Sequence, residues 1–127
     1  MRTVLDTSVL IGPAPTEIDG ELAISTVSLA ELHLGVLVAP TDVARAERLR
    51  RVGLVERTFS ALPVDAAVAR AYGRLAAAVV AAGRRPRSRS LDLLIAATAV
   101  AHGARLGTRN PGDLVGLEDH LEVLTLS

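Results

Sequence analysis

The fold is decided by the segment RTVLD at residues 2–6. Within it the apolar pair Val4-Leu5 is followed at once by Asp6, which suits a short, buried parallel strand with a carboxylate at its carboxyl end. Helical segments separate this strand from the strands that follow. The alternation predicts an α/β fold, in which helices cover both faces of a mostly parallel sheet of about five strands. The further predicted strands lie at residues 21–25, 62–64, 104–108 and 122–126.

Capping residues and apolar periodicity indicate where the helices lie. Ser28 and Glu31 have the spacing of a capping box, and Asp65 is a suitable N-cap for a long alanine-rich helix. Residues 7–11 are expected to turn, and the GPAP segment at residues 12–15 is expected to break any helix that begins there. The predicted helices run from Ser28 to near Pro40, from Thr41-Asp42 through a charged, solvent-facing segment, from Asp65 to about Ala82, and from about Ser90 to His102 before Gly103.

Length and composition bound the class of protein. The 127 residues fit a single domain, residues 1–127, with an aliphatic core, since only Phe59 and Tyr72 are aromatic. Cys is absent, which excludes disulfides, thiolate nucleophiles and cysteine-rich zinc sites. All 14 basic residues are Arg, which excludes a Walker-type phosphate loop and Schiff-base chemistry. Because the formal net charge is zero, binding to nucleic acid would require a local basic patch.

Neither a membrane span nor a secretion signal is expected. The apolar stretches at residues 75–82 and 93–101 are shorter than the roughly 18 to 20 residues that a span requires. The amino-terminal segment reaches Asp6 before it could form the apolar core of a signal peptide. We therefore expect a cytoplasmic protein without membrane contact.

Four acids are candidate site residues, and each has a second interpretation. Asp6 would lie at the carboxyl end of the first strand, where open α/β sheets gather their sites. Asp92 is flanked by apolar residues, but an acid in the first turn of a helix is also stabilised by the helix dipole, by roughly 0.3 to 1 kcal/mol. Glu31 would serve equally as a capping-box acid, and Asp113, after Pro-Gly, as a turn residue. Taken singly, these acids do not identify a site.

Taken in order, the segments around the acids resemble the motifs of PIN-domain ribonucleases. VLDTSVL at residues 4–10 is similar to the first motif of that family, and STVSLAEL at residues 25–32 to the second. SLDLLIAATA at residues 90–99 resembles the third motif very closely, and TRNPGDL at residues 108–114 resembles the fourth. Within the family the chain looks most like the VapC-type toxins of bacterial toxin–antitoxin pairs, along essentially its whole length.

The resemblance implies a PIN-like three-layer α/β/α domain and a metal-dependent endoribonuclease, the toxin component of a type II toxin–antitoxin system. Asp6, Glu31, Asp92 and Asp113 would be both catalytic and metal-binding residues, with Mg²⁺ as the ion and Mn²⁺ as a substitute. A metal-bound water would hydrolyse an RNA phosphodiester. In the fourth motif of the family, an acid occupies the position of Asn110 or that of Asp113. Here Asn110 is uncharged, so only Asp113 is charged. The hydroxyls expected either to hydrogen-bond the site or to cap turns are those of Thr7, Ser8 and Thr108.

The arginine loop, RRPRSR at residues 84–89, is the only concentrated basic segment. It lies just before Asp92, so Arg85, Arg87 and Arg89 are candidate contacts to RNA phosphates, although a solvated loop is an equal interpretation. Since aromatic side chains are so few, base stacking cannot be the main mode of recognition, and we expect selection of a folded RNA by its shape. The resemblance further implies a homodimer and a cognate VapB-like antitoxin, whose C-terminal segment would lie near the acids.

The sequence is compatible with two other functions. A phosphatase with an aspartyl nucleophile could use Asp6, but that chemistry generally needs a second Asp two residues later and a lysine, whereas the chain has Ser8 and no lysine. A catalytically silent PIN-like module that binds RNA or protein would keep the fold without turnover. The acids at the three stronger motif positions argue against it, and a metal-dependent RNA cleavage assay distinguishes the two cases.

Overall fold

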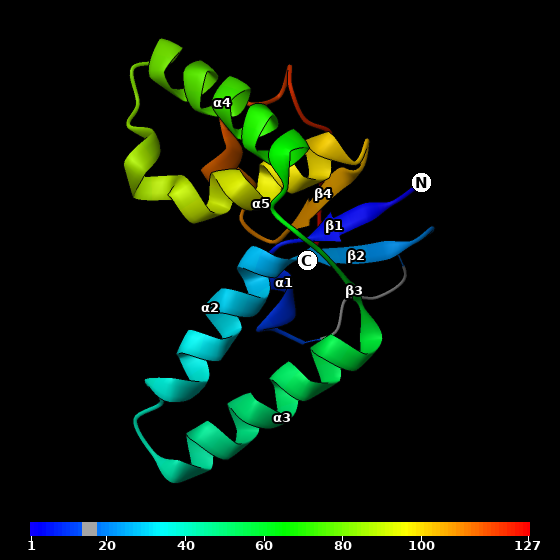
Figure 1. The fold of residues 1–127 in the computed structure, drawn as a ribbon, viewed down its shortest axis with the longest axis vertical. Helices are drawn as coiled ribbons and strands as arrows, with labels where there is room; N and C mark the ends of the chain where they lie inside the picture. Colours follow the sequence, from blue (N-terminus) through cyan, green and yellow to red (C-terminus); the bar gives the residue numbers. More distant parts are fainter. Residues whose placement is uncertain (14–17) are drawn as a thin grey trace.

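A computed structural model describes residues 1–13 and 18–127, and its centre is a five-stranded sheet in which every pairing is parallel (Figure 1). The strand order is β3-β2-β1-β4-β5, so β1 is the central strand. In register, Val4 of β1 pairs with Ala23 on one side and with Leu106 on the other. The predicted α/β fold is therefore confirmed. The strands are β1 (Thr3–Leu5), β2 (Leu22–Ser25), β3 (Ser60–Leu62), β4 (Arg105–Thr108) and β5 (Val123–Thr125).

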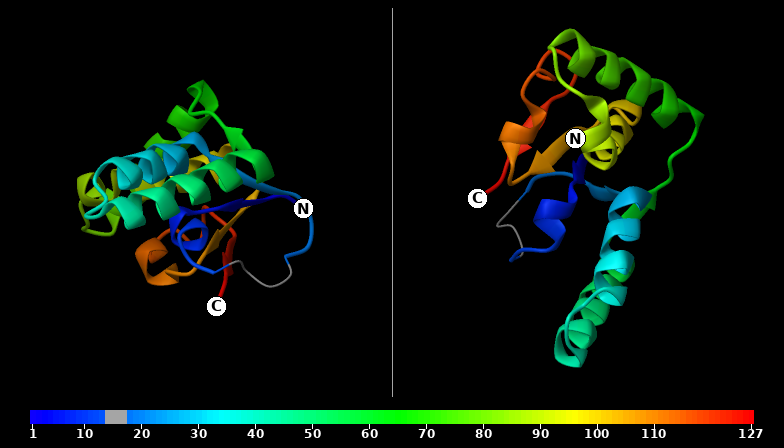
Figure 2. Two further views of the ribbon diagram at one scale, coloured as in Figure 1. Left: turned by 90° about the horizontal axis from the view of Figure 1, so that it is seen from below. Right: turned by 90° about the vertical axis from the view of Figure 1, so that its left-hand side faces the viewer.

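Helices cover both faces of the sheet. In the right-hand view of Figure 2, α4 and α5 lie above the strands, and α1, α2 and α3 lie below them. The side chains of β1 alternate between the two layers: Val4 packs with Leu75 and Ile95 in one buried cluster, and Leu5 packs with Val9 and Ile24 in the other. The result is a three-layer α/β/α domain. The helices are α1 (Thr7–Leu10), α2 (Thr26–Leu37), α3 (Asp42–Thr58), α4 (Ala66–Ala81) and α5 (Ser90–Ala101).

Side-chain caps confirm two of the predicted helix starts. Thr41 Oγ1 accepts a hydrogen bond from the Ala44 amide at 3.1 Å, where α3 begins. Asp65 Oδ1 accepts one from the Val68 amide at 3.0 Å, where α4 begins. The end of α5 is also where the sequence places it, because Gly103 adopts a φ of 61°, a conformation that favours glycine.

Helix α2 begins earlier than predicted. Its N-cap is Ser25, whose Oγ accepts a hydrogen bond from the Val27 amide at 3.1 Å. Ser28 lies inside the helix and is buried, so the predicted capping box of Ser28 and Glu31 is wrong. The physical reason is that α2 follows directly on β2, so the hydroxyl of the last strand residue, Ser25, accepts from one of the free amides at the start of the helix.

Two smaller predictions are also corrected. The third strand covers Ser60–Leu62 and not residues 62–64, because Pro63 has no amide proton to donate to a ladder. Residues 7–11 form the short helix α1 and its C-cap, where a turn was expected. Of the predicted helix break at residues 12–15, positions 14 and 15 lie outside the described residues.

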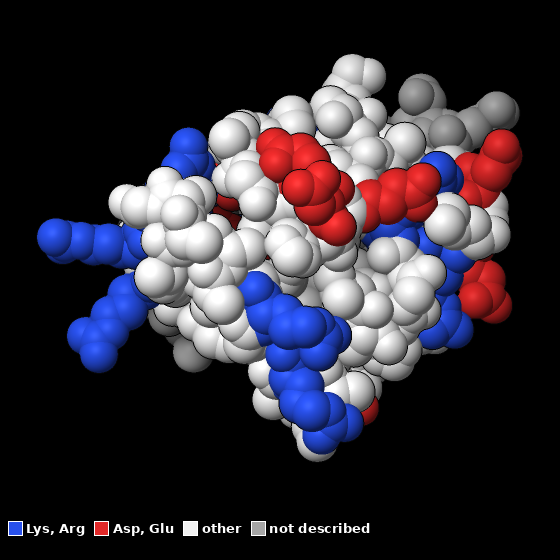
Figure 3. All heavy atoms as spheres, turned by 90° about the horizontal axis from the view of Figure 1, so that it is seen from above, with Lys and Arg blue, Asp and Glu red and all other residues white. Residues whose placement is uncertain are grey.

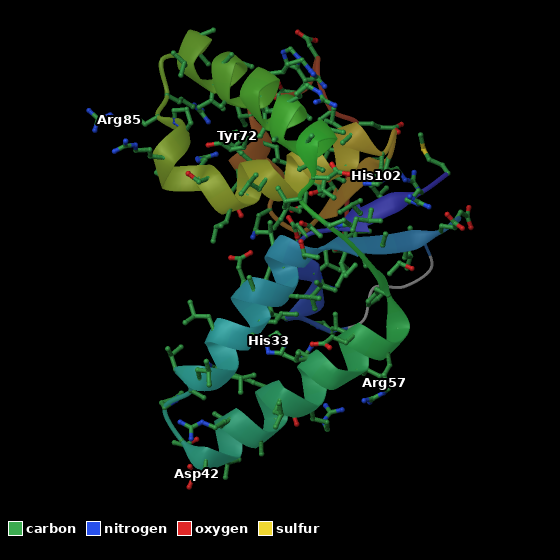
Figure 4. All side chains as sticks on the ribbon, in the orientation of Figure 1. His33, Asp42, Arg57, Tyr72, Arg85 and His102 are labelled. Atoms are coloured by element: carbon green, nitrogen blue, oxygen red, sulfur yellow. The ribbon has the colours of Figure 1, made fainter. Side chains whose placement is uncertain are left out.

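The α2–α3 hairpin extends beyond the edge of the sheet, and Asp42 marks its far end (Figure 4). Of the 17 residues of α3, only Val52 and Val55 are buried. Leu34 and Leu37, near the end of α2, are 60% and 74% exposed. Among residues 1–13 and 18–127, no helix combines the length and hydropathy of a membrane span.

Candidate active site

The four acids singled out in the sequence line one cavity of about 290 Å³. Asp6 directly follows β1, Glu31 lies in the first half of α2, and Asp92 lies in the first turn of α5. Asp113 belongs to the 3-10 helix η2 (Pro111–Leu114), which follows β4. Because β1 is central and its neighbours run parallel to it, the segments that follow these strands converge at one end of the sheet. The fold thus brings together side chains that are up to 107 positions apart, from Asp6 to Asp113.

Asp6 is held by hydrogen bonds that use a single carboxylate oxygen. Its Oδ1 accepts from Ser8 Oγ at 2.5 Å and from the Val9 amide at 3.4 Å. Ser8 Oγ in turn accepts from the Arg109 amide at 3.1 Å, which ties the end of β1 to the residue after β4. Asp6 Oδ2 makes no hydrogen bond within the described part of the chain, so one oxygen of this carboxylate is available to a ligand.

Glu31 is oriented by a short chain of hydroxyl groups. Thr7 Oγ1 lies 2.7 Å from Glu31 Oε1 and 3.0 Å from Ser28 Oγ. A hydroxyl carries only one proton, so when Thr7 donates to Glu31 it accepts from Ser28. Ser28 is fully buried and connects α2 to α1 at this point. Sequence reasoning assigned Ser28 to a cap and missed this role, although its position three residues before Glu31 on one helical face was a usable signal.

A second pair of hydroxyls joins two of the helices that carry the acids. Thr98 Oγ1 of α5 lies 3.2 Å from Ser25 Oγ and 2.8 Å from the carbonyl oxygen of Leu94, and both hydroxyl-bearing residues are completely buried. Ser25 is also the N-cap of α2. The pair therefore links the helix that carries Asp92 to the start of the helix that carries Glu31. Nothing in the sequence pattern singles out this contact, because its partners are 73 positions apart.

The electrostatics of the cavity are dominated by like charges. The pKa of Asp92 is raised above its usual value, first by partial burial and then by the negative charges of Glu31, Asp113 and Asp6. Arg89 opposes this shift. Asp92 nevertheless keeps substantial contact with solvent. Carboxylates that repel one another in this way are stabilised by a cation.

The donor set suits a hard divalent cation bound partly through water. Carboxylate oxygens are the ligands that Mg²⁺ and Mn²⁺ prefer, and Mg²⁺ usually retains several waters while it contacts one or two carboxylates. Among the residues that the structure describes, no three His, Asp or Glu side chains converge closely enough to hold an ion directly. The residues therefore suit an ion that binds few carboxylates directly and keeps several waters, and not an ion whose ligands all come from the protein.

The fourth motif has two positions at which the family can carry an acid, Asn110 and Asp113, and both residues line the acidic cavity. Thr108 Oγ1 accepts a hydrogen bond from the Asn110 amide at 3.0 Å, so this hydroxyl caps the turn. Thr7 and Ser8, by contrast, contact the acids directly. Of the three hydroxyls, those of Thr7 and Ser8 therefore hydrogen-bond the site, and that of Thr108 caps a turn.

The arginines of the arginine loop differ in their surroundings. Arg89, at the end of the 3-10 helix η1 (Pro86–Arg89), donates from Nη1 to the carbonyl oxygen of Asp113 and so lies beside the acids. Arg85 points outward into solvent at the outer edge of the loop (Figure 4), and Figure 3 shows basic side chains projecting from that side of the molecule. Arg87 is also exposed. Of the three predicted RNA contacts, Arg89 has a hydrogen bond to a residue that lines the acidic cavity.

Comparison with known proteins identifies the family. The model of the PIN domain matches residues 3–112, which include the first four strands and the acids Asp6, Glu31 and Asp92. An acidic cavity at one end of a parallel sheet between two helical layers accompanies this match. The chain belongs to the PIN-domain family, as its motifs indicated.

Within that family the similarity to VapC proteins extends over nearly the whole chain. Ribonuclease VapC4 of Mycobacterium tuberculosis is 40% identical over 131 residues, which cover 98% of this chain and 97% of that protein. Ribonuclease VapC5 of the same organism is 38% identical over 113 residues, covering 84% and 82%. The crystal structure of VapBC-5 from Mycobacterium tuberculosis, a member of the VapBC family of toxin–antitoxin systems, matches with a TM-score of 0.85 and 37% identity and covers 98% of both chains.

Proposed function

We propose that this chain is a metal-dependent endoribonuclease and the toxin of a toxin–antitoxin pair. The observation that carries the proposal is the convergence of Asp6, Glu31, Asp92 and Asp113 on one cavity. Its support is the similarity to proteins named as VapC ribonucleases over almost the full length of the chain. The reaction is hydrolysis of an RNA phosphodiester bond.

The side chains of the cavity have distinct tasks in this proposal. Asp6 and Asp92 would be the principal ligands of a Mg²⁺ or Mn²⁺ ion, and Glu31 and Asp113 would complete the site or orient the attacking water. When bound, the ion supplies an activated water and offsets negative charge on the phosphate. Ser8 fixes the Asp6 carboxylate through Oδ1. Thr7 fixes Glu31 in the same way, so neither acid needs to reorient when substrate binds.

The proposal includes the setting in which the nuclease works. Its partner is a VapB-like antitoxin, which is supported by the similarity to a structure described as VapBC. We further propose a homodimer in the cytoplasm, as is expected of the family. Of the loop arginines, Arg89 would contact RNA at the site, which its hydrogen bond to Asp113 supports, and Arg85 and Arg87 would contact more distant phosphates of a folded RNA.

The test is cleavage of total cellular RNA by the purified chain, with the new RNA ends mapped. We expect cleavage with Mg²⁺ or Mn²⁺, and none after chelation of metal with EDTA. Asp92→Asn should lower the rate at least about 100-fold, because a ligand and its charge are lost from the reaction centre. Asp42→Asn is the matched control, since it removes the same charge from the far end of the α2–α3 hairpin.

The result also separates the proposal from its alternative. Undiminished cleavage by both Asp6→Asn and Asp92→Asn would contradict the assignment of the site. Binding of RNA by the wild-type protein without any cleavage, at every metal concentration, would establish the catalytically silent module instead.

A further inference from the structure

A second cavity adjoins the acidic one. Its volume is about 350 Å³, and it shares Thr7, Ile11 and Glu31 with the acidic cavity. The two cavities are therefore contiguous around the Glu31 side chain. The rest of the second cavity, which we call the arginine cavity, is lined by Leu32 and Gly35 of α2 and by Arg48, Arg51 and Val52 of α3.

The two arginines are fixed at the wall of this cavity by the main chain. Arg48 Nη1 donates to the carbonyl oxygen of Gly35 at 2.8 Å. Arg51 Nη1 donates to the carbonyl oxygens of Leu10 and Gly12 at 3.1 and 3.0 Å. Each contact uses only one nitrogen of the guanidinium group. No carboxylate of the described residues forms an ion pair with either arginine, so the cavity wall carries positive charge next to the acids.

We infer that the arginine cavity binds the nucleotide next to the phosphate that is cut, with Arg48 and Arg51 as its phosphate contacts. This inference rests on the proposed function. An acidic cavity repels RNA, and a protein of zero net charge has no overall attraction that could compensate. A substrate that reaches the acids therefore needs cations beside them, and a guanidinium group is suited to a phosphate because it offers parallel N–H donors.

The apolar part of the wall fits the rest of a nucleotide. Ile11, Leu32 and Val52 line it, and aliphatic side chains accept a ribose or the face of a base without specific hydrogen bonds. The guanidinium planes of the arginines can also stack on a base. This provides a stacking surface in a protein that has almost no aromatic side chains.

The arginine loop does not supply the same contact. Arg85 points away from the molecule (Figure 4), and Arg89 lies beside Asp113. Arg48 and Arg51 instead lie beyond Glu31. A strand of RNA that crosses the acids would thus meet arginine on both sides of the site.

The experiment measures binding of a fluorescent RNA oligonucleotide, made from a mapped cleavage site, by anisotropy in EDTA and at several salt concentrations. Arg48→Ala is the primary variant, because Arg48 is exposed and its loss should not prevent folding. We expect affinity to fall about three- to fivefold and the salt slope to fall by about 0.7, the value for one phosphate of a single strand. Arg48→Lys should lose less affinity than Arg48→Ala.

Arg50→Ala is the matched control. It removes the same charge from the same helix, but Arg50 is hydrogen-bonded to Glu47 and does not line the cavity. Equal loss of affinity in Arg48→Ala and Arg50→Ala would overturn the inference. The inference would also be overturned if Arg48→Ala kept its affinity for RNA. If the same variant bound an acidic hexapeptide less tightly, the cavity would be a protein-docking groove. If the wild-type protein neither binds nor cleaves RNA, the proposed function itself fails, and the inference fails with it.

Discussion

The helix pairs α4–α5 and α2–α3 position the acids that they carry, Asp92 and Glu31, by different means. Helix α5, which carries Asp92, packs against α4, and half of its 12 residues are buried. The α2–α3 hairpin, which carries Glu31, extends beyond the sheet and has long exposed segments. Asp92 is consequently positioned by the hydrophobic core. Glu31 is positioned by Thr7 and Ser28, a local chain of hydrogen bonds.

The contacts within each pair show the same contrast. Alanines such as Ala71 and Ala96 are fully buried between α4 and α5, which allows the two helices to approach closely. In the hairpin, His33 of α2 contacts Glu56 of α3 at 2.7 Å in an exposed pair. Exposed polar pairs contribute little to stability. We therefore expect the hairpin to open locally at a lower free energy than α4 and α5, which should unfold only with the whole domain.

The largest change in the free energy of unfolding should come from a substitution in the α4–α5 pair. Leu75→Ala removes a side chain that is 1% exposed, and the cavity should lower the free energy of unfolding by about 3 kcal/mol. Leu54→Ala in α3, at a side chain that is 50% exposed, should cost about 0.5 kcal/mol or less. Urea denaturation measures both. Equal losses would contradict the view that the two pairs differ in their coupling to the core.

The helix caps give a second, smaller contrast. Thr41→Ala and Asp65→Ala each remove an N-cap hydrogen bond, and each loss should be about 1 kcal/mol. Native-state hydrogen exchange should show where the loss appears. We expect Thr41→Ala to speed exchange in α3 alone, and Asp65→Ala to speed exchange throughout the domain. Exchange that rises globally in both variants would show that the hairpin does not open independently.

The smallest effect is electrostatic and concerns two first-turn acids, Asp92 of α5 and Asp42 of α3. Because the pKa of Asp92 is higher in the folded protein, the protonated carboxyl group favours the folded state. This stabilisation is fully present below the pKa of the unfolded chain, near 3.8, and is lost as pH rises through the pKa of the folded protein. In the metal-free protein at neutral pH, Asp92→Asn should therefore stabilise the fold by roughly 0.5 kcal/mol or less, because the carboxylate keeps solvent contact.

Asp42→Asn should have the opposite sign. Its charge lies at the start of a helix without an acidic cavity around it, so its removal loses a favourable interaction with the helix dipole, of about 0.3 kcal/mol. Thermal unfolding at neutral pH and near pH 4, without metal, compares the two variants. Destabilisation by Asp92→Asn at neutral pH would show that the dipole outweighs the repulsion among the acids.

The sequence predicted those parts of the molecule that depend on neighbours along the chain. Asp6 directly after an apolar pair, Thr41 and Asp65 before helices, and Gly103 after one were all identified, because strand ends and caps have local signatures. The four acids were grouped by family resemblance, since no spacing rule links Asp6 to Asp113.

Contacts between distant segments could not be predicted in this way. Ser28 follows Thr7 by 21 positions, and although its spacing places it on the same helical face as Glu31, that spacing does not identify Thr7 as the partner of both. Arg51 lies in a segment whose alternating charges predicted a solvent-facing helix, yet it is half-buried because α3 folds back on α1 and α2. The arginine cavity depends on that packing and has no motif.

The position of β1 between β2 and β4 also bears on when the acids can meet during synthesis. A ribosome releases β1 and β2 early, but the second neighbour of β1 begins at Arg105, and Asp113 comes later still. Until then, the central strand has one open edge and the cavity lacks a side. A nascent chain that has emerged only as far as α5 already carries Asp6, Glu31 and Asp92, but it lacks β4 and the Arg109 amide that follows β4 and donates to Ser8. Assembly of the acidic cavity is thus delayed until nearly the whole domain has been made.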